Sequence, residues 1–161
     1  MESIIRNNSS EITPQLVAKY FLHKSPLSPK RIQKLVYYSY AWFIALNNQD
    51  PEHIETTLFS EKPEAWLHGP VFPTLYTEYK RFGWNDVPKE KGKVKLDKNV
   101  ASFLDKIWDV FGKYDADELE YMTHQEDPWI KARNGISPAS ASNAKISDKD
   151  IFVYYNELAQ K

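Results

Sequence analysis

The stretch Glu64-Ala65-Trp66-Leu67-His68-Gly69-Pro70-Val71-Phe72-Pro73 places two prolines, a glycine and a histidine inside a run of apolar residues. Proline fixes φ and has no N–H, whereas glycine permits positive φ, so one element must end here and another begin. The apolar neighbours indicate that this turn is buried. We therefore expect a short strand over 64–67, a turn over 68–70, and a helix that starts within 71–74, runs to Phe82 and ends at Gly83.

His68 permits two interpretations. Together with Glu64 it has the residue types of a general acid/base pair. Alternatively, both ring nitrogens bind backbone groups around a buried turn. The second interpretation is favoured, because one histidine and one carboxylate do not make a catalytic set by themselves.

Length and composition restrict the class of protein. The 161 residues suffice for one domain, which we place at 12–161 behind a flexible N-terminus at 1–11, and the 14% aromatic content predicts an aromatic core. Because 21 basic residues nearly balance 22 acidic ones, nucleic-acid binding is not expected. The absence of cysteine excludes disulfides and fits the cytoplasm. Neither a secretory signal nor a membrane span is expected, because no apolar run is long enough.

Helix start signals recur along the chain. Positions 13–14 and 28–29 each combine a Thr or Ser N-cap with a proline, and 115–118 has the pattern of a capping box. The middle of the second helix is apolar nearly all round, which is typical of a central buried helix. The expected helices start at Pro14, at Pro29 (running to Leu46), at Pro73, after Asp97 (ending at Gly112), after Asp115 and at Pro128 behind an Asp127 cap, and the last covers 147–159.

The strand signals are short. Residues 57–59 and 64–67 flank a four-residue connection and predict a small β-hairpin, and 93–96 is a third candidate strand. With the helices, these segments predict a mainly α fold of the α+β type, a compact helical domain with a small β-hairpin or short sheet.

The sequence lacks the motifs of common enzyme classes. It contains no phosphate loop, no G-x-G-x-x-G, no H-E-x-x-H and no G-x-S-x-G. His124 with Glu126 and Asp127 comes nearest to a metal site, but no second histidine stands at helical spacing. The favoured interpretation of His124 is structural, as an imidazole that binds backbone at the start of the next helix. We expect no cofactor and no metal.

Three blocks of sequence, taken together, resemble the Panacea domain, the SocA-like domain of proteins associated with phages and mobile elements. The resemblance covers 13–133, and the tail from Gly135 carries no matching motif. The motif residues are Gln33, Lys34, Leu35, Tyr37, Tyr38 and Trp42 in the first block, Glu64, Ala65, Trp66, His68, Gly69, Pro70, Val71, Pro73 and Tyr76 in the second, and Thr123, His124, Pro128 and Trp129 in the third.

The resemblance implies an antitoxin. Members of the family neutralise varied toxins, including small alarmone-synthetase toxins, by direct binding, and one member delivers its toxin to the ClpXP protease. No enzymatic activity is established for the domain. We interpret the motif residues as a scaffold, because a domain used against many toxins should keep its core and vary its surface.

The region 115–127 concentrates acidic residues, and it is the predicted toxin-contact surface because toxins that bind nucleotides or RNA carry basic sites. The candidate contact residues are Asp117, Glu120, Glu126 and Asp127. Capping and solvation are the alternative explanation for these acids, and the basic positions 30–34 and the loop 89–98 are alternative contact faces.

Two rival functions remain on the sequence alone. The first is a hydrolase-like enzyme that uses His68, Glu64, His124 and Glu126. The second is a proteolytic adaptor or phage regulator.

Overall fold

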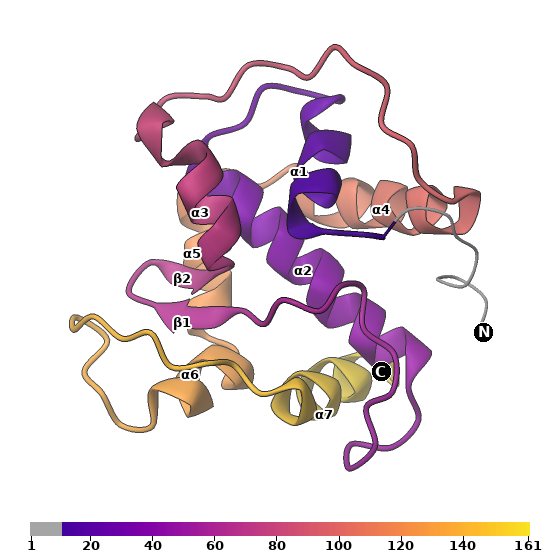
Figure 1. The fold of residues 1–161 in the computed structure, drawn as a ribbon. Helices are drawn as coiled ribbons and strands as arrows, with labels where there is room; N and C mark the ends of the chain where they lie inside the picture. The colour runs from indigo at the N-terminus through magenta and orange to yellow at the C-terminus, as the bar shows by residue number, and fades with distance from the viewer. Residues whose placement is uncertain (1–10) are drawn as a thin grey trace.

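A computed structural model describes residues 11–161, so the predicted flexible N-terminus lies almost entirely outside the described residues. The mainly α class with a small sheet is confirmed (Figure 1). The elements are α1 (Pro14–Leu22), α2 (Pro29–Asn47), β1 (Glu64–Trp66), β2 (Gly69–Val71), α3 (Pro73–Tyr79), the 3₁₀ turn η1 (Lys80–Phe82), α4 (Lys98–Phe111), α5 (Ala116–His124), α6 (Asp127–Arg133) and α7 (Asp148–Ala159). None of the helices in 11–161 is long and apolar enough to cross a membrane.

Helix α2 is the centre of the fold, as its apolar middle predicts. It packs against α1, α3, α4, α5, α7 and β2, and Figure 1 shows it crossing the middle of the molecule. Every residue from 32 to 41 is buried. The core around α2 is aromatic: Tyr38 stacks on Phe111 with ring centroids 4.1 Å apart, and Tyr155 meets the edges of Tyr37 and Tyr38. The predicted aromatic core is confirmed.

The helix starts agree closely with the local signals. Thr13, Ser28 and Asp97 each accept a hydrogen bond from a backbone N–H in the first turn, and 115–118 forms a complete capping box. The prediction for α6 was wrong in one detail, because Glu126 rather than Asp127 occupies the N-cap position and its side chain makes no cap hydrogen bond. The helix predicted over 73–82 divides into α3 and η1.

The hairpin forms at a different place from the one predicted. β1 pairs antiparallel with β2, with Ala65 opposite Pro70, whereas 57–59 and 93–96 are not strands. Gly69 has φ +105°, which lets the chain reverse across the two residues Leu67 and His68. Pro70 is tolerated because the carbonyl of Ala65, which lies opposite it, accepts from Nη1 of Arg133 at 2.9 Å and needs no N–H from β2. What reads as a turn in the sequence is therefore a complete short hairpin.

Candidate functional site

The hairpin is fastened to α2 by two polar side chains that are almost fully buried. Gln33 forms a two-way clamp on Phe72: its amide donates to the carbonyl at 3.2 Å, and its Oε1 accepts from the N–H at 2.9 Å. Nζ of Lys34, the next residue in α2, donates to the carbonyl of Pro70 at 3.1 Å. Burial lowers the pKa of Lys34 to about 7, with nearby Lys30 acting in the same direction and Glu120 opposing.

Gly69 lets the hairpin approach its neighbours very closely. A Cβ at this position would lie 2.6 Å from Cε of Lys34 and 2.9 Å from the hydroxyl oxygen of Thr123. Together with its positive φ, this contact makes glycine the only residue that fits without displacement of the lysine or the threonine. The three motif blocks thus meet at one point, with Lys34 from the first, Gly69 from the second and Thr123 from the third.

Glu120 on α5 connects two basic side chains beside this junction. Its carboxylate accepts from Nζ of Lys30 at 2.5 Å and from Nδ1 of His68 at 3.0 Å. Nε2 of His124 lies 3.9 Å away from the same carboxylate. Burial alone would raise the pKa of Glu120, but the hydrogen bonds from Lys30 and His68 lower it below its usual value. Lys30 also pairs with Asp117 at 2.8 Å.

The third block supports the other side of the hairpin. The indole N–H of Trp129 donates to the carbonyl of Trp66 at 2.9 Å, and Nη1 of buried Arg133 donates to the carbonyl of Ala65 at 2.9 Å. The ring of His124 stacks on Trp129 with centroids 4.0 Å apart. Burial lowers the pKa of His124, so a neutral ring is favoured.

Glu126 points into the aromatic core. Its Oε1 accepts from the hydroxyls of Tyr38, at 2.9 Å, and Tyr155, at 2.7 Å. Burial raises the pKa of Glu126 to about 7, although both tyrosine hydrogen bonds act in the opposite direction. Asp127, the next residue, is exposed.

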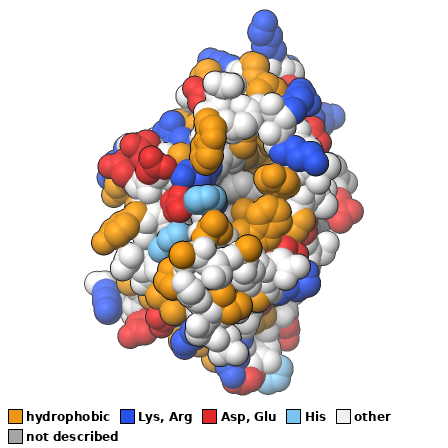
Figure 2. Space-filling view, turned by 90° about the vertical axis from the view of Figure 1, so that its left-hand side faces the viewer, with side chains coloured by type: hydrophobic (Ala, Val, Ile, Leu, Met, Phe, Trp, Pro, Cys, Tyr) orange, Lys and Arg blue, Asp and Glu red, His pale blue; other side chains and the backbone are white. Residues whose placement is uncertain are grey.

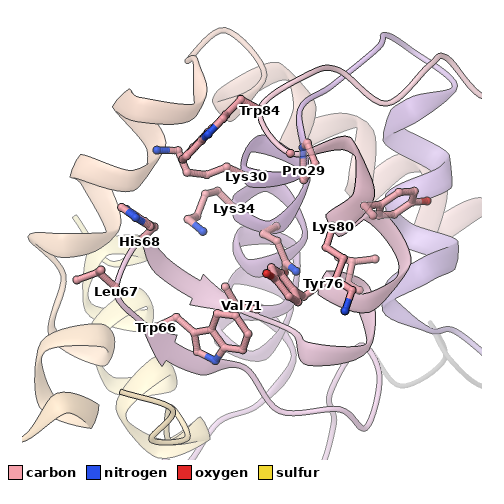
Figure 3. A pocket seen from close by; sticks show the side chains of 14 residues that line it. Pro29, Lys30, Lys34, Trp66, Leu67, His68, Val71, Tyr76, Lys80 and Trp84 are labelled. Carbon is pink, nitrogen blue, oxygen red and sulfur yellow. The ribbon is translucent and has the colours of Figure 1, made fainter. Parts of the chain in front are cut away.

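A cavity of about 380 Å³ opens beside the hairpin, between the first turns of α2 and the segment α3–η1. Figure 2 shows it as a hollow with orange side chains on its walls and blue side chains at its margin, and Figure 3 shows the lining residues. Motif residues from two blocks line it, namely Gln33, Lys34, Trp66, His68, Val71 and Tyr76. Trp66 is consequently half-buried on a cavity wall, although the apolar neighbours in its stretch indicated a buried turn.

The structure separates the residues that the sequence grouped as a possible enzyme site. His68 is exposed, and its Nδ1 is hydrogen-bonded to Glu120. Both predictions for this residue, a pair with Glu64 and a ring bound to backbone groups through both nitrogens, were therefore wrong. Glu64 instead accepts from the indole of Trp66 at 2.8 Å. Glu126 is enclosed by tyrosines, as described above. Within 11–161 no three His, Asp or Glu side chains approach closely enough to hold a metal ion.

Of the four acidic residues predicted to contact a toxin, two are exposed and two are directed toward the interior. Asp117, with 91% of its side chain exposed, and Asp127 lie at the surface. Glu120, 19% exposed, is occupied by Lys30 and His68, and Glu126 faces the core. A continuous acidic face made of all four residues is therefore not present.

Sequence reasoning missed two features of the site. Trp84, which lines the cavity and has 77% of its surface exposed, was not singled out, because a single apolar residue in a loop is an ordinary surface feature. The role of Glu120 gave no local signal, because its partners Lys30 and His68 are 90 and 52 residues away in sequence.

Fold and site together define a mainly α protein in which a β-hairpin is docked on a central helix beside a ligand-sized cavity. Residues 32–130 match the family described as "Antitoxin SocA-like, Panacea domain", and the chain belongs to this family. The resemblance inferred from the three blocks is confirmed, and the family supports an antitoxin-type role. No curated protein and no solved structure matches the chain.

Proposed function

We propose that this chain is an antitoxin that neutralises a cognate protein toxin by direct contact. The observation that carries the proposal is the family match, which covers 32–130 and so spans the site from Ile32 in α2 to Ile130 in α6. A phage or mobile element is the expected genetic setting, and the cytoplasm is the expected location. A small toxin of the alarmone-synthetase type is one candidate partner.

The outer face of α5 is the proposed contact surface for the toxin. Asp117 and Tyr121 lie one helical turn apart on this helix, and both are exposed. An exposed tyrosine beside a carboxylate supplies the large apolar contact and the charge that interfaces with basic partners use. Asp127 at the start of α6 adds a second exposed carboxylate, whereas Glu120 and Glu126 act from inside the protein.

We further propose that the protein works without catalysis. The separation of Glu64 and Glu126 from His68 supports this, because a general acid and base must reach the same substrate atoms. His68 and His124 do share Glu120, but Nδ1 of His68 is at hydrogen-bond distance from that carboxylate while Nε2 of His124 is not.

The test is co-expression with the product of the adjacent gene. That product should arrest growth when expressed alone, the present chain should restore growth, and the two purified proteins should elute together at a fixed ratio. Toxin abundance then separates two mechanisms. An unchanged toxin level with restored growth supports sequestration, whereas a level that falls only in cells with ClpXP supports delivery to that protease. Restored growth without any complex or loss of toxin would overturn both.

A further inference from the structure

The cavity beside the hairpin has the dimensions of a small-molecule site. Its volume of about 380 Å³ lies within the range of about 300–1,000 Å³ that is typical of ligand pockets. Three separate segments build it: the start of α2, the hairpin, and the segment from α3 to Trp84 (Figure 3). Gln33 and Lys34 fix the hairpin, and Phe72 at the start of α3, to α2, so this part of the cavity is formed before any ligand arrives.

Aromatic rings form two walls of the cavity. Trp66 and Tyr76 contact each other with centroids 5.0 Å apart, and Figure 3 shows Trp84 across the cavity from them. Trp84 is 77% exposed and Tyr76 is 44% exposed, so much apolar surface faces water at this mouth. Nζ of Lys30 lies over the Trp84 ring, 5.6 Å from its centroid, so aromatic surface and a basic group occur together at this mouth. Aromatic side chains of this kind provide contact area for an aromatic ligand.

Basic side chains line the cavity. Lys30, Lys34 and Lys80 belong to the lining, together with His68, and none of the described lining residues carries a carboxylate. Lys34 is 1% exposed, and only the carbonyl of Pro70 accepts a hydrogen bond from its Nζ within the described residues. The nearest carboxylate, Glu120, is bound to Lys30 and His68 instead.

A buried ammonium with one hydrogen bond is costly, because its two other N–H groups have lost water without gaining a partner. Burial correspondingly lowers the pKa of Lys34 to about 7. An anion in the cavity would provide the missing acceptors and favour the charged form of the lysine. A negatively charged group in the cavity would therefore supply the hydrogen-bond acceptors that the ammonium group of Lys34 lacks.

We propose that the cavity binds a small flat organic anion, an aromatic ring system that carries a phosphate, sulfonate or carboxylate. The ring lies between Trp84 and the pair Trp66–Tyr76, and the anionic group lies toward Lys34 and Lys30. This ligand site is additional to the toxin-contact surface on α5. A free small molecule fits better than a protein segment because the volume is modest and the cationic group lies at the floor rather than at the rim.

The experiment compares two fluorescent probes of similar shape, anilinonaphthalene sulfonate, which is an anion, and N-phenyl-naphthylamine, which is neutral. Binding to the full-length protein is measured by dye fluorescence, and stoichiometry by calorimetry. We expect one saturable site, with the anion bound about 10- to 100-fold more tightly, since a charge-assisted hydrogen bond contributes about 1.5–3 kcal/mol.

Three variants test whether the probes bind in this cavity. Trp84→Ala, at an exposed position where folding is not at risk, should weaken both probes by roughly tenfold, as loss of a stacking partner does. Lys34→Met should weaken the anion alone and reduce the difference in affinity between the two probes. The matched control is Tyr121→Ala, which removes an exposed aromatic ring outside the cavity and should change neither affinity.

Two results would overturn the proposal. One is the absence of saturable binding to the wild type, or binding that Trp84→Ala leaves unchanged. The other is equal affinity of the wild type for both probes, which would remove the case for an anion. If no probe binds and Trp84→Ala abolishes growth rescue, the cavity holds a segment of the toxin instead.

Discussion

Replacing Glu126 by a side chain that cannot ionise should make the protein more stable near neutral pH. In the folded protein burial raises the pKa of Glu126 from 4.5 to about 7. The folded state therefore holds this proton more tightly than the unfolded chain does. Below pH 4.5 the carboxyl group of Glu126 is protonated in both the folded and the unfolded protein, so it does not change the free energy of unfolding. As the pH rises from 4.5 to 7 the unfolded chain releases the proton first, so the free energy of unfolding falls and then levels off.

The size of the effect follows from the same two pKa values. The interval from 4.5 to about 7 corresponds to a loss of at most about 3 kcal/mol, at about 1.4 kcal/mol for each pH unit. Glu126→Gln keeps an oxygen that can accept from the hydroxyls of Tyr38 and Tyr155, but it cannot ionise. Relative to the wild type, we expect the variant to gain ~1–3 kcal/mol in stability between pH 5 and pH 8.

The assay is urea denaturation of wild type and variant at several pH values between 5 and 8. Contributions from other titrating groups, Lys34 among them, cancel because only the difference between the two proteins is compared at each pH. Asp127→Asn is the matched control: it removes the charge of the adjacent exposed carboxylate, and its effect should not vary over this range. A difference between Glu126→Gln and wild type that stays constant from pH 5 to pH 8 would refute the reasoning, because the carboxyl group would then be solvated.

Three further predictions concern the toxin surface, the histidines and the hairpin. Asp117→Lys should slow association with the toxin, most strongly at low salt, whereas Glu157→Lys on α7 should not; stopped-flow rates at two salt concentrations decide this, and equal rates would point to another face. His68→Asn and His124→Gln should still neutralise the toxin, with losses that follow their melting temperatures; rescue lost at native stability and affinity would instead indicate catalysis. Gly69→Ala should cost ~1–3 kcal/mol in urea denaturation, since φ is +105° and the new methyl group meets Lys34; an unchanged midpoint would contradict that contact.

Local physics explains which parts of the fold the sequence predicted. Caps such as Ser28 act through hydrogen bonds to residues three positions away, so their signal lies within one turn of chain. The hairpin was misplaced because strands of three residues carry no alternation, and a proline in β2 reads as a turn. Its register depends on the positive φ of Gly69 and on contacts with α2, neither of which is a local property.

The site was harder to predict, because its chemistry depends on burial. Lys30 and Lys34 read as ordinary solvated charges near a helix start, yet their spacing of four places both on the side of α2 that meets the cavity. One of them pairs with carboxylates from α5, and the other is buried with a single acceptor. The sequence shows that Lys30 and Lys34 share a face of a helix, but it does not show which of the two is buried.

The motif residues divide into two groups once their surroundings are known. Gln33, Gly69 and Trp129 hold the hairpin in place, and each is satisfied by its contacts, as the scaffold interpretation requires. Lys34 and Trp66 fit that interpretation less well. A buried lysine with one hydrogen bond is expensive, and an apolar side chain of similar length would stabilise the same position better. Stability alone therefore does not account for Lys34, and a binding role for the cavity floor supplies the reason that packing does not.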